Sequence, residues 1–121
     1  MTRYLIIILC VCIFSAQLSL PVITNAAFPP VKFVSVRSPV LRGGTGLVVI
    51  QTTPGTPCTI TVIYSSGPSH AQGLDPKTAD TRGRITWSWK IGTRTTRGAW
   101  PIVVECGRDE ITRIRTSFEV T

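Results

Sequence analysis

Histidine and acidic residues are scarce in this sequence, which has one histidine and six Asp and Glu residues among 121. The histidine, His70, lies in a stretch rich in Ser, Gly and Pro, and such a stretch favours a surface loop. A catalytic triad needs a nucleophile, a base and an orienting acid, but no nucleophile-elbow motif is present. The acids are scattered, without the paired carboxylates that glycoside hydrolysis requires. We therefore predict that the chain is not an enzyme and uses no cofactor.

The sequence also lacks helical periodicity and any run of five or six basic residues. Without helices the chain cannot connect the strands of a parallel sheet, and without a basic run we predict no dedicated nucleic-acid binding. Basic residues nevertheless outnumber acidic ones by 13 to 6, for a formal net charge of +7. That balance favours anionic partners, such as phospholipid headgroups, acidic polysaccharide or another anionic polymer of the cell envelope.

The N-terminal stretch has the layout of a secretory signal peptide. Arg3 precedes an apolar run over residues 5–16, and the segment ends in small residues at Ala26 and Ala27. The run is shorter than the roughly 20 residues that span a bilayer, so we predict a signal peptide over residues 1–26. The alternative is an uncleaved anchor, which would be the only link to a membrane. Either way, the chain is expected to be secreted or at the cell surface.

The rest of the chain alternates apolar and polar residues in short stretches, separated by turns rich in Gly and Pro. Such period-two alternation with β-branched residues is typical of half-buried strands. The predicted strands cover residues 32–38, 47–52, 58–64, 84–92, 99–106 and 111–121. Between them we predict a long loop over 65–83, with a short strand or turn near 74–79. The pattern predicts an all-β, antiparallel two-sheet sandwich of six to seven strands.

The cysteines provide a check on this arrangement. Cys10 and Cys12 fall in the predicted signal peptide, which leaves Cys58 and Cys106. Two cysteines in an exported chain most simply form one disulfide, and both fall on the inward faces of their strands. We expect the bridge to join the two sheets. Too few His and Cys ligands then remain for a zinc site, and we predict no metal.

The three tryptophans lie close together in the sequence, with the same phase as the apolar residues of their strands. We predict that Trp87 and Trp89 are core residues, because sandwich cores pack large aromatics between their sheets. Trp100 follows a turn and precedes Pro101. It is either part of the core or a half-exposed contact residue at the rim of the sandwich.

A basic turn separates the last two tryptophans. Arg94 and Arg97 lie in it, and Lys90 ends the strand before it. Charges in turns are often simply solvated, but loops at the ends of a sandwich are also where recognition residues lie. The candidate binding residues are therefore Lys90, Arg94, Arg97 and Trp100.

The stretch from Ser38 to Val120 resembles the small bacterial immunoglobulin-like (Ig-like) or fibronectin-type-III-like modules of secreted and surface proteins. The resemblance rests on a Pro-Gly turn before a cysteine strand, on "SGPS", "KTAD" and "WSW", and on "GAWP" leading to the second cysteine. It implies a leader and first strand over 27–37 and an Ig-like domain over 38–121.

The same resemblance implies a non-catalytic role. Members of the family are accessory units such as spacers, adhesion modules or wall-associated modules. We expect a secreted Ig-like module for binding or adhesion, with an extracellular protein or an anionic envelope polymer as its partner. The alternative is a module that binds polysaccharide or cell-wall polymer through Trp100 and the turn around Arg94 and Arg97. An extracellular hydrolase is a third, more remote class.

Overall fold

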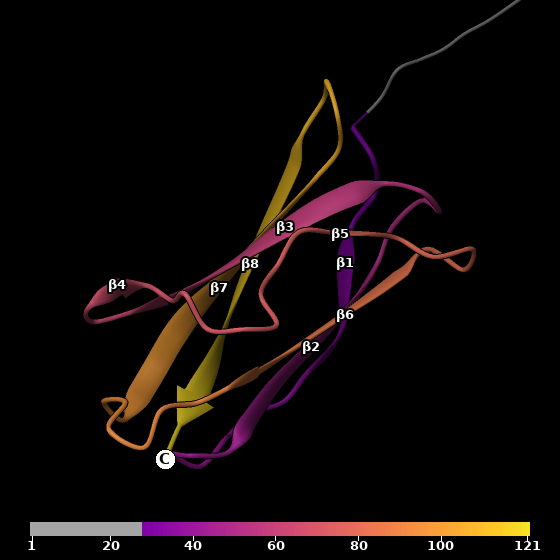
Figure 1. Cartoon of the computed structure of the whole chain (residues 1–121). Coiled ribbons are helices and arrows are strands. Elements are labelled where there is room, and N and C mark those ends of the chain that lie inside the picture. The colour runs from indigo at the N-terminus through magenta and orange to yellow at the C-terminus, as the bar shows by residue number, and fades with distance from the viewer. Residues whose placement is uncertain (1–27) are drawn as a thin grey trace, which may run out of the picture.

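The computed structural model describes residues 28–121, so the predicted signal peptide at 1–26 lies outside the described residues. All regular structure in the described part is β, as predicted (Figure 1). The strands are β1 (Lys32–Val36), β2 (Thr45–Gln51), β3 (Pro57–Tyr64), β4 (Gly67–Pro68), β5 (Lys77–Thr78), β6 (Arg84–Lys90), β7 (Gly98–Cys106) and β8 (Thr112–Val120). Six have five residues or more and correspond to the six predicted strands. The other two have two residues each and lie in the predicted loop.

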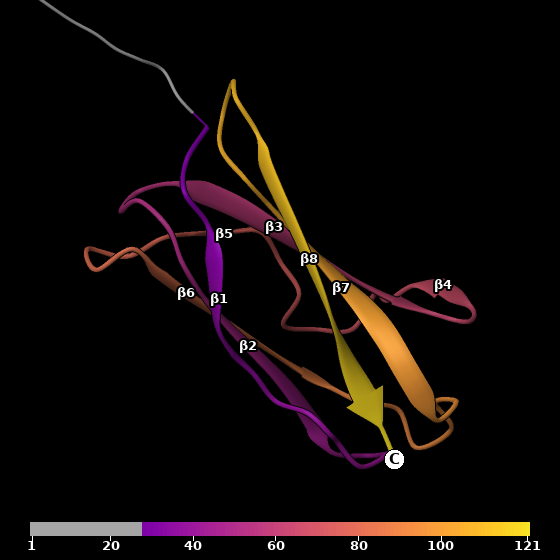
Figure 2. The same cartoon turned by 180° about the vertical axis from the view of Figure 1, so that it is seen from behind.

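The strands form two sheets that pack face to face as a sandwich (Figures 1 and 2). One sheet has the order β1-β2-β6, and the other has the order β4-β3-β7-β8, with β5 also paired to β3. All the strand pairs are antiparallel. Of the six longer strands, the first, second and fourth thus lie in one sheet, opposite the third, fifth and sixth.

The alternating pattern explains which residues fill the space between the sheets. Along β6, for example, Ile85, Trp87 and Trp89 are buried, and the residues between them are exposed. The inward residues of β2, β3, β7 and β8 follow the same alternation and join one core cluster. Each strand places alternate side chains on opposite faces, so this periodicity was enough to assign the core faces correctly.

The two core tryptophans are fixed at their polar atoms as well as by packing. Trp87 is fully buried, and its indole N–H donates to the carbonyl of Asp75 at 2.8 Å. The indole N–H of Trp89 donates to the hydroxyl of Tyr64 at 3.2 Å, and its ring lies edge-on to Phe118. Opposite Trp89 on β2 is Gly46, where an added methyl group would lie 2.5 Å from the indole ring. Glycine therefore makes room for Trp89.

The segment between β3 and β6 is more ordered than the predicted loop. The prediction of a short strand near residues 74–79 is confirmed by β5, but β4 was not predicted. The segment also lies along the outer edge of β6, where the Lys77 ammonium donates to the Thr86 carbonyl at 2.8 Å. The segment is held by hydrogen bonds to the long strands and by packing of Ala71, Leu74 and Ala79 in or against the core, and neither gives the segment a periodic pattern.

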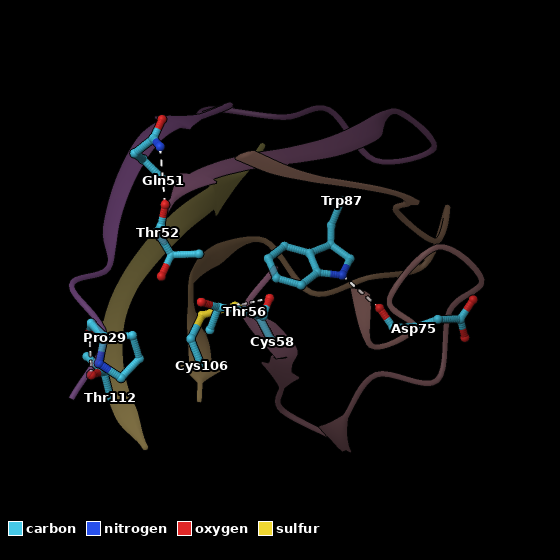
Figure 3. The surroundings of a disulfide bond; sticks show 9 residues. All are labelled: Pro29, Gln51, Thr52, Thr56, Cys58, Asp75, Trp87, Cys106 and Thr112. Carbon is cyan, nitrogen blue, oxygen red and sulfur yellow. Dashed lines mark hydrogen bonds between the residues drawn. A yellow bond between two sulfur atoms is a disulfide. The ribbon is translucent and has the colours of Figure 1, made fainter. Parts of the chain in front are cut away.

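The disulfide joins Cys58 to Cys106 as predicted, but its predicted placement between the sheets is wrong (Figure 3). The two cysteines are direct partners in the antiparallel pairing of β3 with β7, within one sheet, and their Cα atoms are 4.1 Å apart. Both are buried on the inward face. The alternating pattern determines the face on which a cysteine lies, but it does not determine which strands are neighbours. That is why the face was predicted and the sheet was not.

Candidate functional site

One end of the sandwich brings together two loops and the C-terminus (Figure 1). The loops are residues 41–44, before β2, and residues 91–97, between β6 and β7. The Arg42 guanidinium donates to the Thr95 carbonyl at 2.7 Å, and the Ile91 N–H donates to the Gly44 carbonyl at 2.8 Å. The Arg42 N–H also donates to the carbonyl of Thr121. The two loops are therefore held against each other.

Five cationic side chains lie at this end, which we call the basic end. They are Arg37, Arg42, Lys90, Arg94 and Arg97, and all five are exposed. Lys90 is paired with Thr45 across β6 and β2, and the Arg37 guanidinium donates to the carbonyl of that same threonine at 3.1 Å. Three of the predicted residues, Lys90, Arg94 and Arg97, are thus joined by two more.

Arg37 and Arg42 are not among the site residues predicted from the sequence. Arg42 lies 53 positions before its partner Thr95 in the sequence. A turn arginine at that distance gives no local sign that it will meet another turn. Only the pairing of β2 with β6 brings the two loops to one end, because it sets Thr45 opposite Lys90.

The acidic residues are distributed differently from the basic ones. Asp80, Asp109 and Glu110 lie in the turns after β5 and β7, at the opposite end of the sandwich. Asp80 is exposed and accepts hydrogen bonds from the backbone N–H groups of Arg84 and Arg82, which lower its pKa from the ordinary value. The acid nearest to the basic end is Glu119, next to the last residue of β8. The opposite end also carries cations, such as Arg82 and Arg108, but the three acids there lie beside them, so the net positive charge is larger at the basic end.

Trp100, the aromatic candidate, is only partly available to a ligand. It is partly buried on the inward face of β7, opposite Phe118 on β8, and its ring lies edge-on to Tyr64 with centroids 6.0 Å apart. Its indole N–H donates to the Thr96 carbonyl at 2.8 Å. Trp100 therefore packs under the 91–97 loop and holds it by this hydrogen bond, which uses the indole N–H within the protein.

Tyr64 is the titratable group of this aromatic cluster. Burial raises the pKa of its phenol, while the hydrogen bond from Trp89 acts in the opposite direction. The hydroxyl therefore stays neutral at physiological pH and serves as the acceptor for the Trp89 indole. It has a structural role in the packing below the basic end.

The arrangement suits binding of anions. Guanidinium groups present planar arrays of N–H donors and no acceptor, a geometry that matches carboxylate and phosphate groups.

Among residues 28–121, no group of three or more His, Cys, Asp or Glu residues is placed to hold a metal ion. Within the same part of the chain, no helix is long and apolar enough to cross a membrane. His70 is exposed in the loop after β4.

Comparison with known proteins identifies no family. No protein-family model matches the chain, and no curated protein matches it. Among solved structures, it is similar to part of a β-glucosidase from Listeria innocua in complex with glucose. The identity is 10%, the TM-score is 0.45, and the match covers 76% of this chain and 16% of that one. It is also similar to part of a family 123 glycoside hydrolase from Clostridium perfringens, with 13% identity, a TM-score of 0.35, and coverage of 67% and 21%.

The chain thus spans less than a quarter of the length of either glycoside hydrolase. Similarity at this level does not indicate a shared activity, because unrelated functions occur on one fold.

Proposed function

We propose that this protein is an exported, non-catalytic Ig-like module that binds an anionic polymer of the cell envelope through its basic end. The observation that carries the proposal is the convergence of five exposed cations from separate parts of the sequence at one end of the sandwich, where two loops hydrogen-bond to each other. A ligand that contacts several of these cations gains electrostatic attraction from each of them. A single charged turn would provide fewer such contacts.

The nature of the ligand follows from the geometry. The cations project from loops and strand ends around the rim, and the one tryptophan nearby is partly buried and edge-on to Tyr64. Sugar binding usually needs an open aromatic face, and this is not the arrangement of Trp100. A repeating anionic polymer needs only a spaced set of positive charges. The geometry therefore favours charge recognition, with Trp100 as a support for the loop.

Export is supported by the disulfide and by the predicted signal peptide. Disulfides persist mainly in oxidising compartments, and Cys58 and Cys106 form one. We expect N-terminal sequencing of the protein recovered from the culture medium to begin at Ala27 or Phe28. Recovery of membrane-bound chains that still begin at Met1 would instead show an uncleaved anchor.

Binding by the basic end makes a prediction about salt and mutation. Adsorption of the mature protein to purified anionic wall polymer, measured by co-sedimentation, should weaken steeply as salt rises, because exposed charges are screened beyond about 10 Å at 0.1 M. The triple substitution Arg42→Ala, Arg94→Ala and Arg97→Ala should weaken it about tenfold or more at low salt, since about 1.4 kcal/mol of lost attraction suffices for that.

The opposite end of the sandwich supplies the matched control. Arg82→Ala with Arg108→Ala also removes exposed arginines, but from turns at the other end. This variant should keep most of the affinity of the parent. If it lowers the affinity as much as an equal number of substitutions at the basic end, the binding reflects net charge alone, and the proposed site is wrong.

A further inference from the structure

The two sheets have four edge strands, and the structure does not treat the four edges alike. Unpaired N–H and C=O groups at a sheet edge can pair with another chain, so proteins usually protect them. The edge of β6 is covered by the preceding segment: Lys77 hydrogen-bonds to the Thr86 carbonyl, and Gly73 lies so close to the Ser88 carbonyl that no side chain would fit. The edge of β3 is covered at its two ends by β5 and β4, and the Ser69 N–H donates to the Val62 carbonyl, which leaves only a short free stretch between them.

The third edge, on β1, is short and irregular. The strand has five residues, and its register shifts between Phe33 and Ser35. Prolines flank it at Pro30 and Pro39, and proline cannot continue a hydrogen-bonded ladder. Short length, a bulge and flanking prolines are all features that prevent further pairing at an edge.

The fourth edge, on β8, has no such protection along most of its length (Figure 2). The strand has nine residues, all paired with β7 on one side. At its end, the Glu119 carbonyl accepts from the Val40 N–H, and the Glu119 N–H donates to the Ser38 hydroxyl. The backbone groups of Glu119 therefore point away from β7. By alternation, those of Arg113, Arg115 and Ser117 point the same way, and no other segment within residues 28–121 hydrogen-bonds to them.

The side chains around this open edge define what it can accept. Arg113 and Arg115 are exposed on the outer face, while Ile114 and Thr116 are partly buried on the inner face. A strand added beside β8 would therefore place alternate residues next to the two arginines and the others next to Ile114. Opposite charges directly across paired strands are stabilising, and like charges are destabilising.

We infer that the free edge of β8 binds an extended segment of a partner protein in which acidic and apolar residues alternate. The backbone of that segment would continue the sheet, as in other cases of recognition by strand addition. Its carboxylates would lie beside Arg113 and Arg115. A second copy of this chain is a poor occupant. Antiparallel pairing of β8 with itself centred on Ile114 or Arg115 places arginine opposite arginine, and pairing centred further along the strand needs Glu119, whose backbone groups already bond to Val40 and Ser38. The net charge of +7 adds to this selection for an acidic partner.

The test uses the mature protein and a synthetic peptide of about seven alternating Glu and Val residues, long enough to form a typical strand. We expect the peptide to bind, and a peptide with Lys in place of Glu to bind about tenfold or more weakly. Amide hydrogen exchange locates the site. In the free protein, Arg113, Arg115 and Ser117 should exchange faster than Ile114 and Thr116, whose amides face β7. The peptide should slow the exchange of the first three.

Variants separate strand addition from simple charge attraction. Arg113→Glu with Arg115→Glu should reverse the preference between the Glu and Lys peptides. Lys32→Glu with Arg84→Glu removes two exposed cations from the other sheet and should leave it unchanged. The triple alanine variant of the basic end should also bind the peptide normally, so this inference can fail or hold independently of the proposed function.

Three results would overturn the inference. The first is peptide binding that leaves the exchange of Arg113, Arg115 and Ser117 unaltered. The second is equal binding of a peptide with N-methyl groups at alternate residues, which cannot extend the ladder. The third is concentration-dependent association of the protein alone with protection of the same three amides, because the edge would then pair with a second copy.

Discussion

Replacing Cys58 and Cys106 together by alanine should lower the free energy of unfolding by about 2–5 kcal/mol, the usual loss for a native bridge in a small secreted domain. The bond links residues separated by 48 positions. In the chain-entropy model, a loop of that length restricts the unfolded chain by about 4 kcal/mol. Urea unfolding followed by tryptophan fluorescence measures the change, with the parent protein unfolded in its oxidised form.

The position of the disulfide within one sheet adds a second expectation. Because β3 and β7 are already paired along five positions, the strand order does not depend on the bond. The double variant should therefore keep the amide exchange pattern of β7 and β8 in its folded fraction, and it should keep anion binding at the basic end, which lies at the other end of β7. Thiol titration of denatured, unreduced protein should find no free thiol. Two free thiols per chain in freshly exported protein would contradict the bond itself.

Trp89→Ala should be about as damaging as loss of the disulfide, with a cost of about 3–5 kcal/mol. The side chain is 2% exposed, packs edge-on against Phe118 and donates to the Tyr64 hydroxyl. Truncation leaves a large cavity between the sheets, and it removes the partner of a partly buried hydroxyl. Gly46, whose lack of a side chain accommodates the indole, cannot fill that space. Thermal and urea unfolding should both show the loss.

Trp100→Ala is the matched control, because it removes the same side chain from a partly exposed position on β7. Its cost should be clearly smaller than that of Trp89→Ala, since less apolar surface leaves the interior. The loop at 91–97 should nevertheless become more mobile, because the indole donates to Thr96. Equal losses for the two variants would mean that Trp100 belongs to the core as fully as Trp89 does.

The two proposed binding surfaces of this protein would bind their ligands through different chemical groups. The basic end depends on side-chain charge, so salt and alanine substitutions should reduce its binding. The β8 edge depends on backbone groups, with Arg113 and Arg115 selecting the partner, so N-methylation of a peptide should abolish its binding. Ile111 and Phe28, which are exposed near the start of β8, offer further apolar contact there. Under the two proposals together, the protein would hold a protein partner at an anionic envelope.

The sequence by itself determined the elements and their faces. Alternation with a period of two placed Ile85, Trp87 and Trp89 inside, and it did the same for Cys58 and Cys106. Gly and Pro marked the turns between the long strands, with boundaries that differ from the structure by one or two residues at most of their ends. These properties are local, because they depend on the geometry of one strand and on which side chains avoid water.

The features that depend on the order of strands in the sheets were decided only by the tertiary structure. It placed the two cysteines on neighbouring strands of one sheet, brought Arg37 and Arg42 to the turn that holds Arg94 and Arg97, and left β8 as the open edge. The pattern of one strand does not specify its neighbour, because every amphipathic strand offers the same kind of backbone edge and the same kind of apolar face. The neighbours are selected by packing over the whole sandwich, around Trp87, Trp89 and Phe118, to which residues far apart in the sequence contribute together.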